Sequence, residues 1–296
     1  MGVVSLLPMR SVSALTLVVL AASACAQPVT PKPDPELDAR QRRADSALVR
    51  PAPTPDDAAS GATTTDHGVE LGDALVVVRV TVEPGEGGLD ALNLHDDEET
   101  SVEAAKAVVG AHGGRVVELV HSGERNVTFG VGGRTYQADP NRMFTEAGRR
   151  RTLASLSQAD DVAEAALEAF ADSVLALYTA VEPVVVVTLH NNTDENYSAR
   201  SYAAGAEYAT DAAAVTIHPG TDADDFFFVT DRAIYDALVA RGFNAVLQDN
   251  DAATDDGSLS VWAARHGVPY VNVEAQHGHT EAQSRMLEVL REVIAR

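Results

Sequence analysis

The sequence contains little cysteine and few basic residues. Cys25 is the only cysteine in 296 residues, so the chain cannot form an internal disulfide, and its stability has to come from packing or from a bound metal. Lysine occurs only at Lys32 and Lys106, and 44 acidic residues outnumber 22 basic ones, which gives a formal charge of -22. Because nucleic-acid binding requires a basic surface, we expect no nucleic-acid partner.

The first 25 residues lack an apolar run long enough for a transmembrane helix. Arg10 is the only charge there, and an apolar run over residues 12–22 is followed by small residues up to Cys25. This layout predicts a signal peptide over residues 1–25. The residues before Cys25 resemble a bacterial lipoprotein cleavage site, with Ala22 where leucine is usual. We therefore expect an exported protein. It is either a periplasmic or cell-surface lipoprotein that contacts the membrane only through a lipid on Cys25, or a protein secreted after ordinary cleavage.

Aromatic and branched apolar residues are scarce in residues 26–68, where proline, small and charged residues dominate. Such a segment cannot bury enough surface to offset the entropy lost on ordering. We predict a disordered tether over residues 26–68 that holds a folded domain, residues 69–296, away from the membrane.

From about residue 74, strand patterns alternate with amphipathic helices. Strands are expected over residues 74–82, 92–95, 116–120, 127–130, 184–189, 213–217, 226–229, 245–247 and 268–273. Helices are expected over residues 101–111, with Ser101 as a cap, 157–180, with Val162 and Val181 on its buried stripe, 231–240, 259–265 and 280–295. Continuous valine runs flanked by helices indicate a sheet buried on both faces. The prediction is a three-layer α/β sandwich with a mostly parallel, mixed central sheet.

Three side chains suited to a metal site follow or end predicted strands. His95 and Glu98 are three residues apart, and His190 ends another apolar run. Zinc binds neutral imidazole and carboxylate readily, and a catalytic zinc needs three protein ligands and one open position. The His95 and Glu98 pair alone also fits a solvated acidic loop. However, ligands collect at the carboxyl ends of strands in this architecture, and His95, His190 and Glu274 all lie at such ends.

Four motifs in this order resemble those of one enzyme family. They are Leu94-His95-Asp96-Asp97-Glu98, then Arg134 with Asp139-Pro140-Asn141-Arg142-Met143-Phe144, then Leu189-His190-Asn191-Asn192-Thr193, and Val273-Glu274-Ala275-Gln276. The family is that of succinylglutamate desuccinylase and aspartoacylase, a branch of the zinc carboxypeptidase fold. The resemblance implies a zinc carboxypeptidase-like fold with one zinc ion, held by His95, Glu98 and His190. It also implies roles for Glu274 as general base, for Arg134 beside the polarised carbonyl, and for Asn141 and Arg142 at a substrate carboxylate.

These roles agree with the chemistry of the side chains. Zinc lowers the pKa of its water to about 7, so that a carboxylate such as Glu274 can take a proton and pass it to a leaving amine. Arginine offers a rigid fork of donors to a carboxylate or an oxyanion. The alternatives are that Arg134 and Arg142 form surface ion pairs and that Glu274 caps the following helix.

The sequence departs from the family pattern in several places. Asp96 and Asp97 replace the usual Gly-Asn, and Pro140 stands where leucine is common. The sequence continues for only 22 residues beyond Glu274, to residue 296, whereas the family has a further β-rich domain that shapes the substrate pocket.

The roles of two further groups of residues stay open. His277 and His279 have three possible roles: they donate hydrogen bonds to the metal ligands, they form a second metal site, or they are simply exposed polar residues. The tyrosines of residues 191–211, Tyr197, Tyr202 and Tyr208, either contact substrate from a lid or pack the loop onto the domain.

The sequence therefore predicts an exported, zinc-dependent hydrolase. It would cleave an amide bond near a free carboxylate, in a small peptide or an acylated amino acid. The alternative is a catalytically silent lipoprotein of the same fold that captures a carboxylated ligand through Arg142.

Overall fold

The computed structural model describes residues 61–86, 88–194 and 196–295. The signal peptide predicted over residues 1–25, with Cys25, and most of the predicted tether lie outside the described residues. No helix in the described part combines the length and the apolar character needed to cross a membrane.

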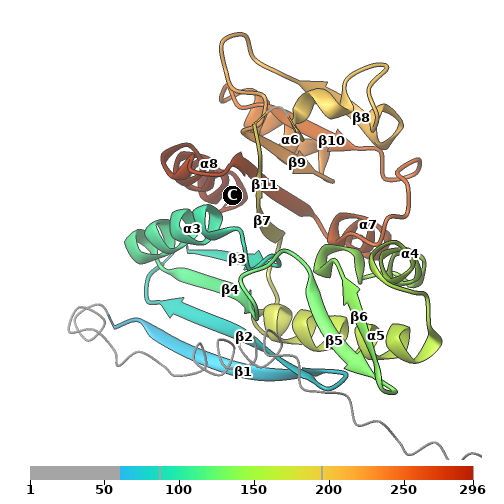
Figure 1. The fold of residues 1–296 in the computed structure, drawn as a ribbon. Helices are drawn as coiled ribbons and strands as arrows, with labels where there is room; N and C mark the ends of the chain where they lie inside the picture. The colour runs from blue at the N-terminus through green and yellow to red at the C-terminus, as the bar shows by residue number, and fades with distance from the viewer. Residues whose placement is uncertain (1–60, 87, 195, 296) are drawn as a thin grey trace, which may run out of the picture. The chain divides into compact units, whose positions relative to one another are not determined.

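The folded domain begins earlier than the sequence indicated. Strand β1 (Thr63–Leu71) includes residues 63–68, which the composition assigns to the tether, and pairs antiparallel with β2 (Ala74–Glu83) (Figure 1). Most of β1 is exposed, so its composition resembles that of a linker. Backbone pairing with β2, rather than burial of side chains, orders this segment, and a composition argument cannot detect it.

A nine-stranded mixed sheet forms the centre of the described chain (Figure 1). Its order is β1-β2-β4-β3-β7-β11-β9-β10-β8. The remaining strands of this sheet are β3 (Leu89–Asn93), β4 (Gly114–Val120), β7 (Val186–Asn192), β8 (Ala212–Thr216), β9 (Phe226–Val229), β10 (Ala245–Gln248) and β11 (Tyr270–Gln276). The central strands β4, β3, β7 and β11 are parallel neighbours, and antiparallel pairs lie toward both edges. A separate hairpin consists of β5 (Val127–Val131) and β6 (Arg134–Ala138).

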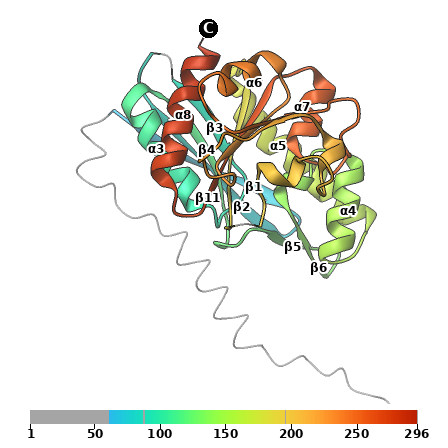
Figure 2. The ribbon, with the colours of Figure 1, turned by 90° about the horizontal axis from the view of Figure 1, so that it is seen from above.

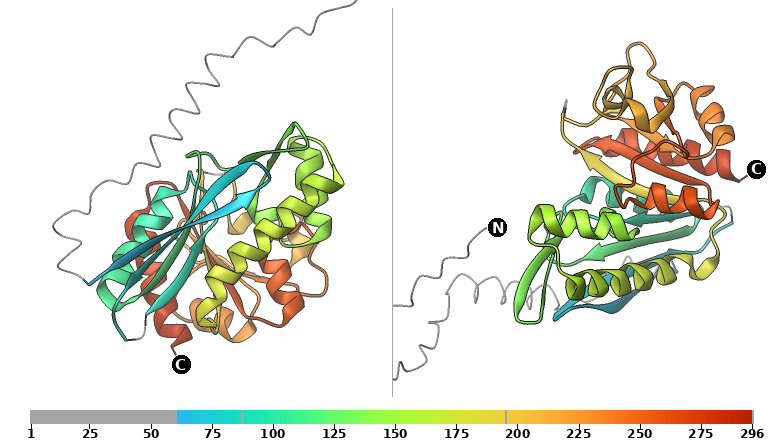
Figure 3. Two further views of the ribbon diagram at one scale, coloured as in Figure 1. Left: turned by 90° about the horizontal axis from the view of Figure 1, so that it is seen from below. Right: turned by 90° about the vertical axis from the view of Figure 1, so that its right-hand side faces the viewer.

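Helices cover both faces of this sheet (Figures 2 and 3). One apolar cluster joins the sheet to α3 (Glu99–His112), α6 (Arg232–Val239) and α8 (Thr280–Ile294). The other joins it to α4 (Glu146–Leu156), α5 (Asp161–Tyr178) and α7 (Leu259–His266). The predicted three-layer α/β architecture with a mixed central sheet is therefore confirmed.

The alternation of side chains along β7 and β11 directs the polar residues to one face. Val187, Leu189 and the matching valines of β11 pack on the side of α3, α6 and α8. The residues that alternate with them along the strands, including His190 and Glu274, therefore point to the opposite face. The two strands are parallel neighbours, and the register pairs Glu274 with His190. This pairing places two predicted site residues side by side.

Two local predictions were wrong, and one helix was missed. Helix α3 begins at Glu99 with Glu98 at its N-cap, so Ser101 is not the cap; its hydroxyl instead donates to the Glu98 carbonyl oxygen over 2.8 Å. Val162, in the first turn of α5, is 60% exposed, and Val181, which lies beyond the end of α5, is 52% exposed, so neither belongs to the buried stripe. Helix α4 was not predicted, because its three consecutive arginines hide the apolar period.

Candidate metal centre and cavity

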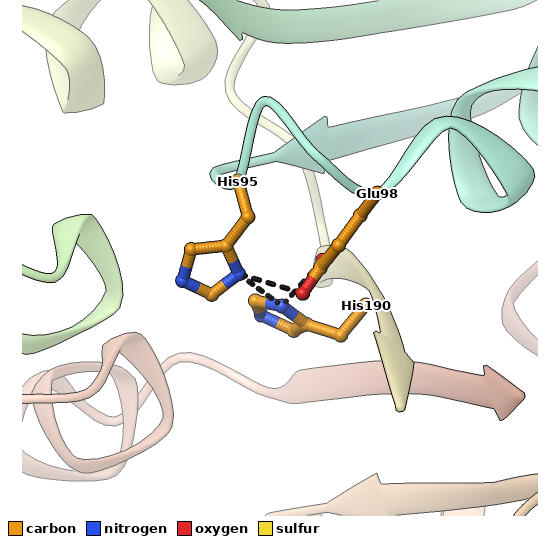
Figure 4. A group of neighbouring side chains, drawn as sticks. All are labelled: His95, Glu98 and His190. Carbon is orange, nitrogen blue, oxygen red and sulfur yellow. Dashed lines mark hydrogen bonds and ion pairs between the residues drawn. The ribbon is translucent and has the colours of Figure 1, made fainter. Parts of the chain in front are cut away.

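The three predicted metal ligands lie together at the carboxyl ends of β3 and β7 (Figure 4). His95 follows β3, Glu98 is the residue just before the first turn of α3, and His190 belongs to β7. His95 Nδ1 is 3.0 Å from His190 Nδ1 and 2.9 Å from Glu98 Oε1, and His190 Nδ1 is 3.1 Å from Glu98 Oε2. All three side chains are buried. They are therefore a compact set of two imidazole nitrogens and one carboxylate.

These distances fit a metal ion. Ligand atoms held tetrahedrally at about 2.0–2.1 Å from a metal lie about 3.3 Å from one another. The observed separations of 2.9–3.1 Å are within a few tenths of an ångström of that value. The donor set also matches, because two imidazoles and one carboxylate form a known three-ligand site with an open position. The described residues therefore supply a site into which a divalent metal fits with little movement.

Residues of the Asp-x-Asn-Arg segment hold the outer nitrogens of both imidazoles. His95 Nε2 lies 2.9 Å from Asp139 Oδ1, a geometry in which the ring donates its proton and leaves Nδ1 free for a metal. The Asn141 side chain lies 3.2 Å from His190 Nε2 and accepts from the Leu259 backbone N–H over 3.2 Å. Asn141 was predicted at a substrate carboxylate, and the structure shows that its side chain also supports a predicted ligand.

The charges of the cluster favour an ionised carboxylate beside a protonated imidazole in the metal-free protein. Burial alone would lower the pKa of His95, but the negative charges of Glu98 and Asp139 outweigh burial and raise this pKa to about 9. Burial alone would raise the pKa of Glu98, but His95 and His190 hold it below its usual range. A metal cation can replace the proton on His95 as the positive charge that the carboxylates require.

Glu274 lies beside this cluster and is 4% exposed. Asn272, two residues earlier on the same face of β11, donates to Glu274 Oε2 over 2.9 Å. Burial and the negative charge of Glu98 raise the pKa of Glu274 to about 8. The structure therefore places a carboxyl group with a near-neutral pKa next to the candidate metal centre.

A cavity of about 820 Å³ opens onto these groups. Its wall includes Glu98, His190 and Glu274. The three tyrosines Tyr197, Tyr202 and Tyr208 also line it, and their rings pack on one another with centroids 5.5–6.2 Å apart. The rings therefore pack the loop together and face the cavity, and their contact with a substrate stays a prediction.

The structure brings Arg125, rather than Arg134, to this cavity. Arg134 begins β6, its side chain is 63% exposed, and Asp160 lies 3.7 Å away; it is absent from the cavity wall formed by the described residues. Arg125 Nη1 donates to Glu98 Oε1 over 2.7 Å, and Arg125 lines the cavity. The prediction for Arg134 is corrected on this point. Arg125 was missed because it lies in a loop, where no periodic pattern indicates the direction of a side chain.

Arg142 lines the cavity, and it already has an acidic neighbour. Its Nε lies 3.4 Å from Asp256 Oδ2, and its Nη1 donates to the Asn141 carbonyl oxygen over 2.7 Å. The Arg142 and Asp256 side chains are each 36% exposed. Such a half-exposed pair is weak, so the guanidinium remains able to bind a substrate carboxylate.

The two histidines after β11 lie in different places. His277 lines the cavity. His279 Nδ1 lies 3.1 Å from both carboxylate oxygens of Asp225, and with Asp222 these residues are a second, more exposed group of potential metal ligands. His279 therefore belongs to a different cluster from His95 and His190.

Comparisons with known proteins find that this chain is similar to several solved structures. No protein-family model matches the sequence, and no curated protein matches it. A succinylglutamate desuccinylase/aspartoacylase from Rhodobacter sphaeroides is similar with a TM-score of 0.38 and 17% identity, over 82% of this chain and 68% of that one. An aspartoacylase family protein from Mesorhizobium loti has a TM-score of 0.39 and 14% identity, over 78% of this chain and 67% of that one. Both structures come from the family that the sequence motifs resemble.

Proposed function

We propose that this chain is a zinc-dependent hydrolase that cleaves an amide bond close to a free carboxylate, in a small peptide or an acylated amino acid. The cluster of His95, Glu98 and His190 carries this proposal. It lies beside Glu274, and Glu98, His190 and Glu274 line one cavity. Zinc held by the first three side chains would supply Lewis acidity toward the amide carbonyl and toward a water molecule.

Glu274 is the residue that moves the proton. Its carboxylate takes a proton from the attacking water and passes it to the leaving amine. A group that first accepts and then donates a proton works best when its pKa lies near the working pH, and the pKa of Glu274 is raised to about 8 in the metal-free protein. The hydrogen bond from Asn272 holds the carboxylate in place.

Two arginines bind and orient the substrate. Arg142 takes the free carboxylate by exchanging its half-exposed contact with Asp256 for a two-pronged contact with the substrate. Arg125 donates to Glu98, so it fixes this ligand, and it is the guanidinium best placed to steady the amide carbonyl. In this proposal Arg125 therefore has the role beside the polarised carbonyl that the sequence resemblance implied for Arg134.

The location proposed for this chemistry is outside the cytoplasm. The sequence of residues 1–25 supports export, and Cys25 is the proposed lipid attachment site. Contact with the membrane would then involve the lipid alone.

A catalytically silent binding protein is a weaker explanation of the cavity. Capture of a carboxylate through Arg142 has no use for a buried acidic group such as Glu274. Burial next to Glu98 also makes ionised Glu274 costly, as its raised pKa shows. A group kept in such surroundings is typical of proton transfer in catalysis.

The proposal is tested with the full chain loaded with zinc and a matched substrate set. Short peptides and acylated amino acids are offered with a free terminal carboxylate and, separately, with that carboxylate converted to an amide. We expect hydrolysis of free-carboxylate substrates, and loss of hydrolysis after zinc is removed by a chelator. Equal cleavage of the amidated set, or activity that survives chelation, would overturn the proposal.

Replacing Arg125 is expected to reduce activity far more than replacing Arg134. Arg125→Ala removes a charged donor from Glu98 and from the carbonyl position, so kcat/KM should fall about 10²–10³-fold. Arg134→Ala removes an exposed contact and should change kcat/KM less than about twofold. Steady-state kinetics on both variants checks this, and a large loss with Arg134→Ala would restore the sequence prediction.

Zinc binding is expected to tighten about tenfold per pH unit between pH 6 and pH 8. The His95 pKa of about 9 means that the ring is protonated over this range, so each unit of rising pH frees ten times more of it for zinc. Asp139→Asn removes one negative charge that raises this pKa, so the dependence should flatten, and affinity should fall about 10–100-fold. Competition titrations at several pH values give both quantities, and a pH-independent affinity in the wild type contradicts the expectation.

A further inference from the structure

A second cavity, of about 340 Å³, shares part of its wall with the first. The residues common to both walls are Arg125, Arg142, Arg151 and Asp256. Three guanidinium groups therefore border both cavities, in a chain where acidic residues outnumber basic ones by 44 to 22. Such a local excess of arginine needs a physical reason.

Helix α4 shows that Arg151 differs from its two neighbours. Arg149 Nη2 lies 2.7 Å from Glu168, and Arg150 Nε lies 2.8 Å from Glu164. Arg151 has no carboxylate within 4.0 Å among the residues that the structure describes. Arg149 and Arg150 are thus paired within the protein, whereas the charge of Arg151 is left for another partner.

The helical spacing explains why Arg151 faces the second cavity. Thr152, Ser155 and Leu156 line the same cavity, and residues four apart lie on one face of a helix. The Thr152 hydroxyl also accepts the backbone N–H of Asp139 over 2.9 Å, which ties this face of α4 to the metal-site segment. The position of Arg151 is therefore held by the same element that supports the site.

The acidic residues of the second cavity are already engaged. Asp139 Oδ1 contacts His95 Nε2 over 2.9 Å and accepts the Asn141 backbone N–H over 2.8 Å. Asp256 Oδ2 lies 3.4 Å from Arg142 Nε. Arg142 is paired with Asp256 and Arg125 with Glu98, so Arg151 is the arginine of this wall that has no carboxylate partner among the described residues.

We propose that Arg151, which lines the second cavity together with Arg142, is an anion subsite that takes an anionic oxygen group. A planar fork of donors suits a carboxylate or a phosphate. The anion is either a second negative group on the substrate, in which case the inference rests on the proposed function, or a free anion from solution. In the first case the substrate carries one anionic group at Arg142 and another at Arg151.

Equilibrium binding to the metal-free full chain tests the subsite without reference to catalysis. The probes are glutarate, with two carboxylates, butyrate, with one, and inorganic phosphate. Glutarate should bind about tenfold more tightly than butyrate, and Arg151→Gln should remove this difference. Arg150→Gln is the matched control, because Arg150 is the paired neighbour on the same helix, and it should bind like the wild type.

The outcomes separate the sources of the anion. Glutarate binding that is lost in Arg151→Gln and unaffected by phosphate supports a second substrate group, whereas displacement by phosphate supports a free anion at the same subsite. Unchanged glutarate binding in Arg151→Gln, or equal losses in both variants, overturns the inference.

An activity measurement then distinguishes failure of the subsite from failure of the proposed function. Paired substrates ending in glutamate or glutamine are hydrolysed by the zinc-loaded chain, and the ratio of their kcat/KM values is compared between wild type and Arg151→Gln. In Arg151→Gln, a ratio that falls toward one because the KM of the glutamate substrate rises supports the subsite. An unchanged ratio opposes it. Absence of zinc and of any hydrolysis in the wild type refutes the proposed function and leaves the binding result standing.

Discussion

Zinc bound by the full chain, at about one ion per molecule, is expected to disappear when His190 is replaced by alanine. His190 supplies one of only two imidazole nitrogens in the cluster, and its Nδ1 lies 3.0 Å from His95 Nδ1 and 3.1 Å from Glu98 Oε2. Removing an outer partner of a metal ligand already costs about 10–100-fold in affinity, so losing a ligand should cost more than about a hundredfold. Metal analysis of protein purified without added metal, followed by a zinc competition titration, measures both the content and the affinity.

His279→Ala is the control for this experiment. His279 belongs to the second group of potential ligands, with Asp222 and Asp225, so its loss should leave the zinc content unchanged. If zinc were lost from His279→Ala and retained in His190→Ala, the zinc would be assigned to the group of Asp222, Asp225 and His279. Zinc absent from all three proteins, even after zinc is supplied, would refute a metal-dependent hydrolase.

Glu274→Gln is expected to keep zinc and to lose most of the hydrolytic activity. Glutamine has the size of glutamate, but its amide cannot accept the proton from water or return it to the leaving amine. Positioned acid–base groups contribute about 10²–10⁴-fold to rates, and kcat should fall within this range. The measurements are steady-state kinetics on the zinc-loaded variant and its metal content, and a kcat within a few-fold of wild type would exclude Glu274 as the base.

The pH dependence of the free energy of unfolding distinguishes a catalytic role of Glu274 from a structural one. The pKa of Glu274 rises from 4.5 to about 8 on folding, so the folded state holds more protons than the unfolded state between these pH values. The free energy of unfolding of the metal-free protein should therefore fall as the pH rises from 4.5 through 8. Glu274→Gln lacks this group and should lose less stability over the same range, whereas a residue needed for the fold would destabilise the protein when replaced.

Much of the candidate site could be predicted from the sequence because its members lie at strand ends. His95, His190 and Glu274 each follow or end a Val- or Leu-rich strand, and parallel neighbours bring such ends to one edge of the sheet. Glu98 lies on the first turn beyond His95, so its proximity is local. These four positions depend on strand pattern and short spacing, which a linear sequence contains.

The residues that support the site could not be predicted in the same way. Asp139 approaches His95 from 44 positions away, and Arg125 approaches Glu98 from 27 positions away, both through loops. Asn272 shows a partial signal, because it lies two residues before Glu274 on the same face of a strand. A loop carries no period, so the direction of its side chains depends on how the whole chain packs.

The sequence by itself determined the α/β class, most strands and helices, the convergence of His95, Glu98, His190 and Glu274, and the acidic character of the chain. Each of these follows from composition or from periods of two and 3.6 residues, which operate over short distances along the chain. Tertiary structure alone decided that Arg125 rather than Arg134 reaches the cavity, that β1 is ordered, and that Arg151 is left without an acidic partner among the described residues. Those outcomes depend on contacts between segments far apart in sequence, because packing and backbone pairing select one arrangement among many that the local pattern permits.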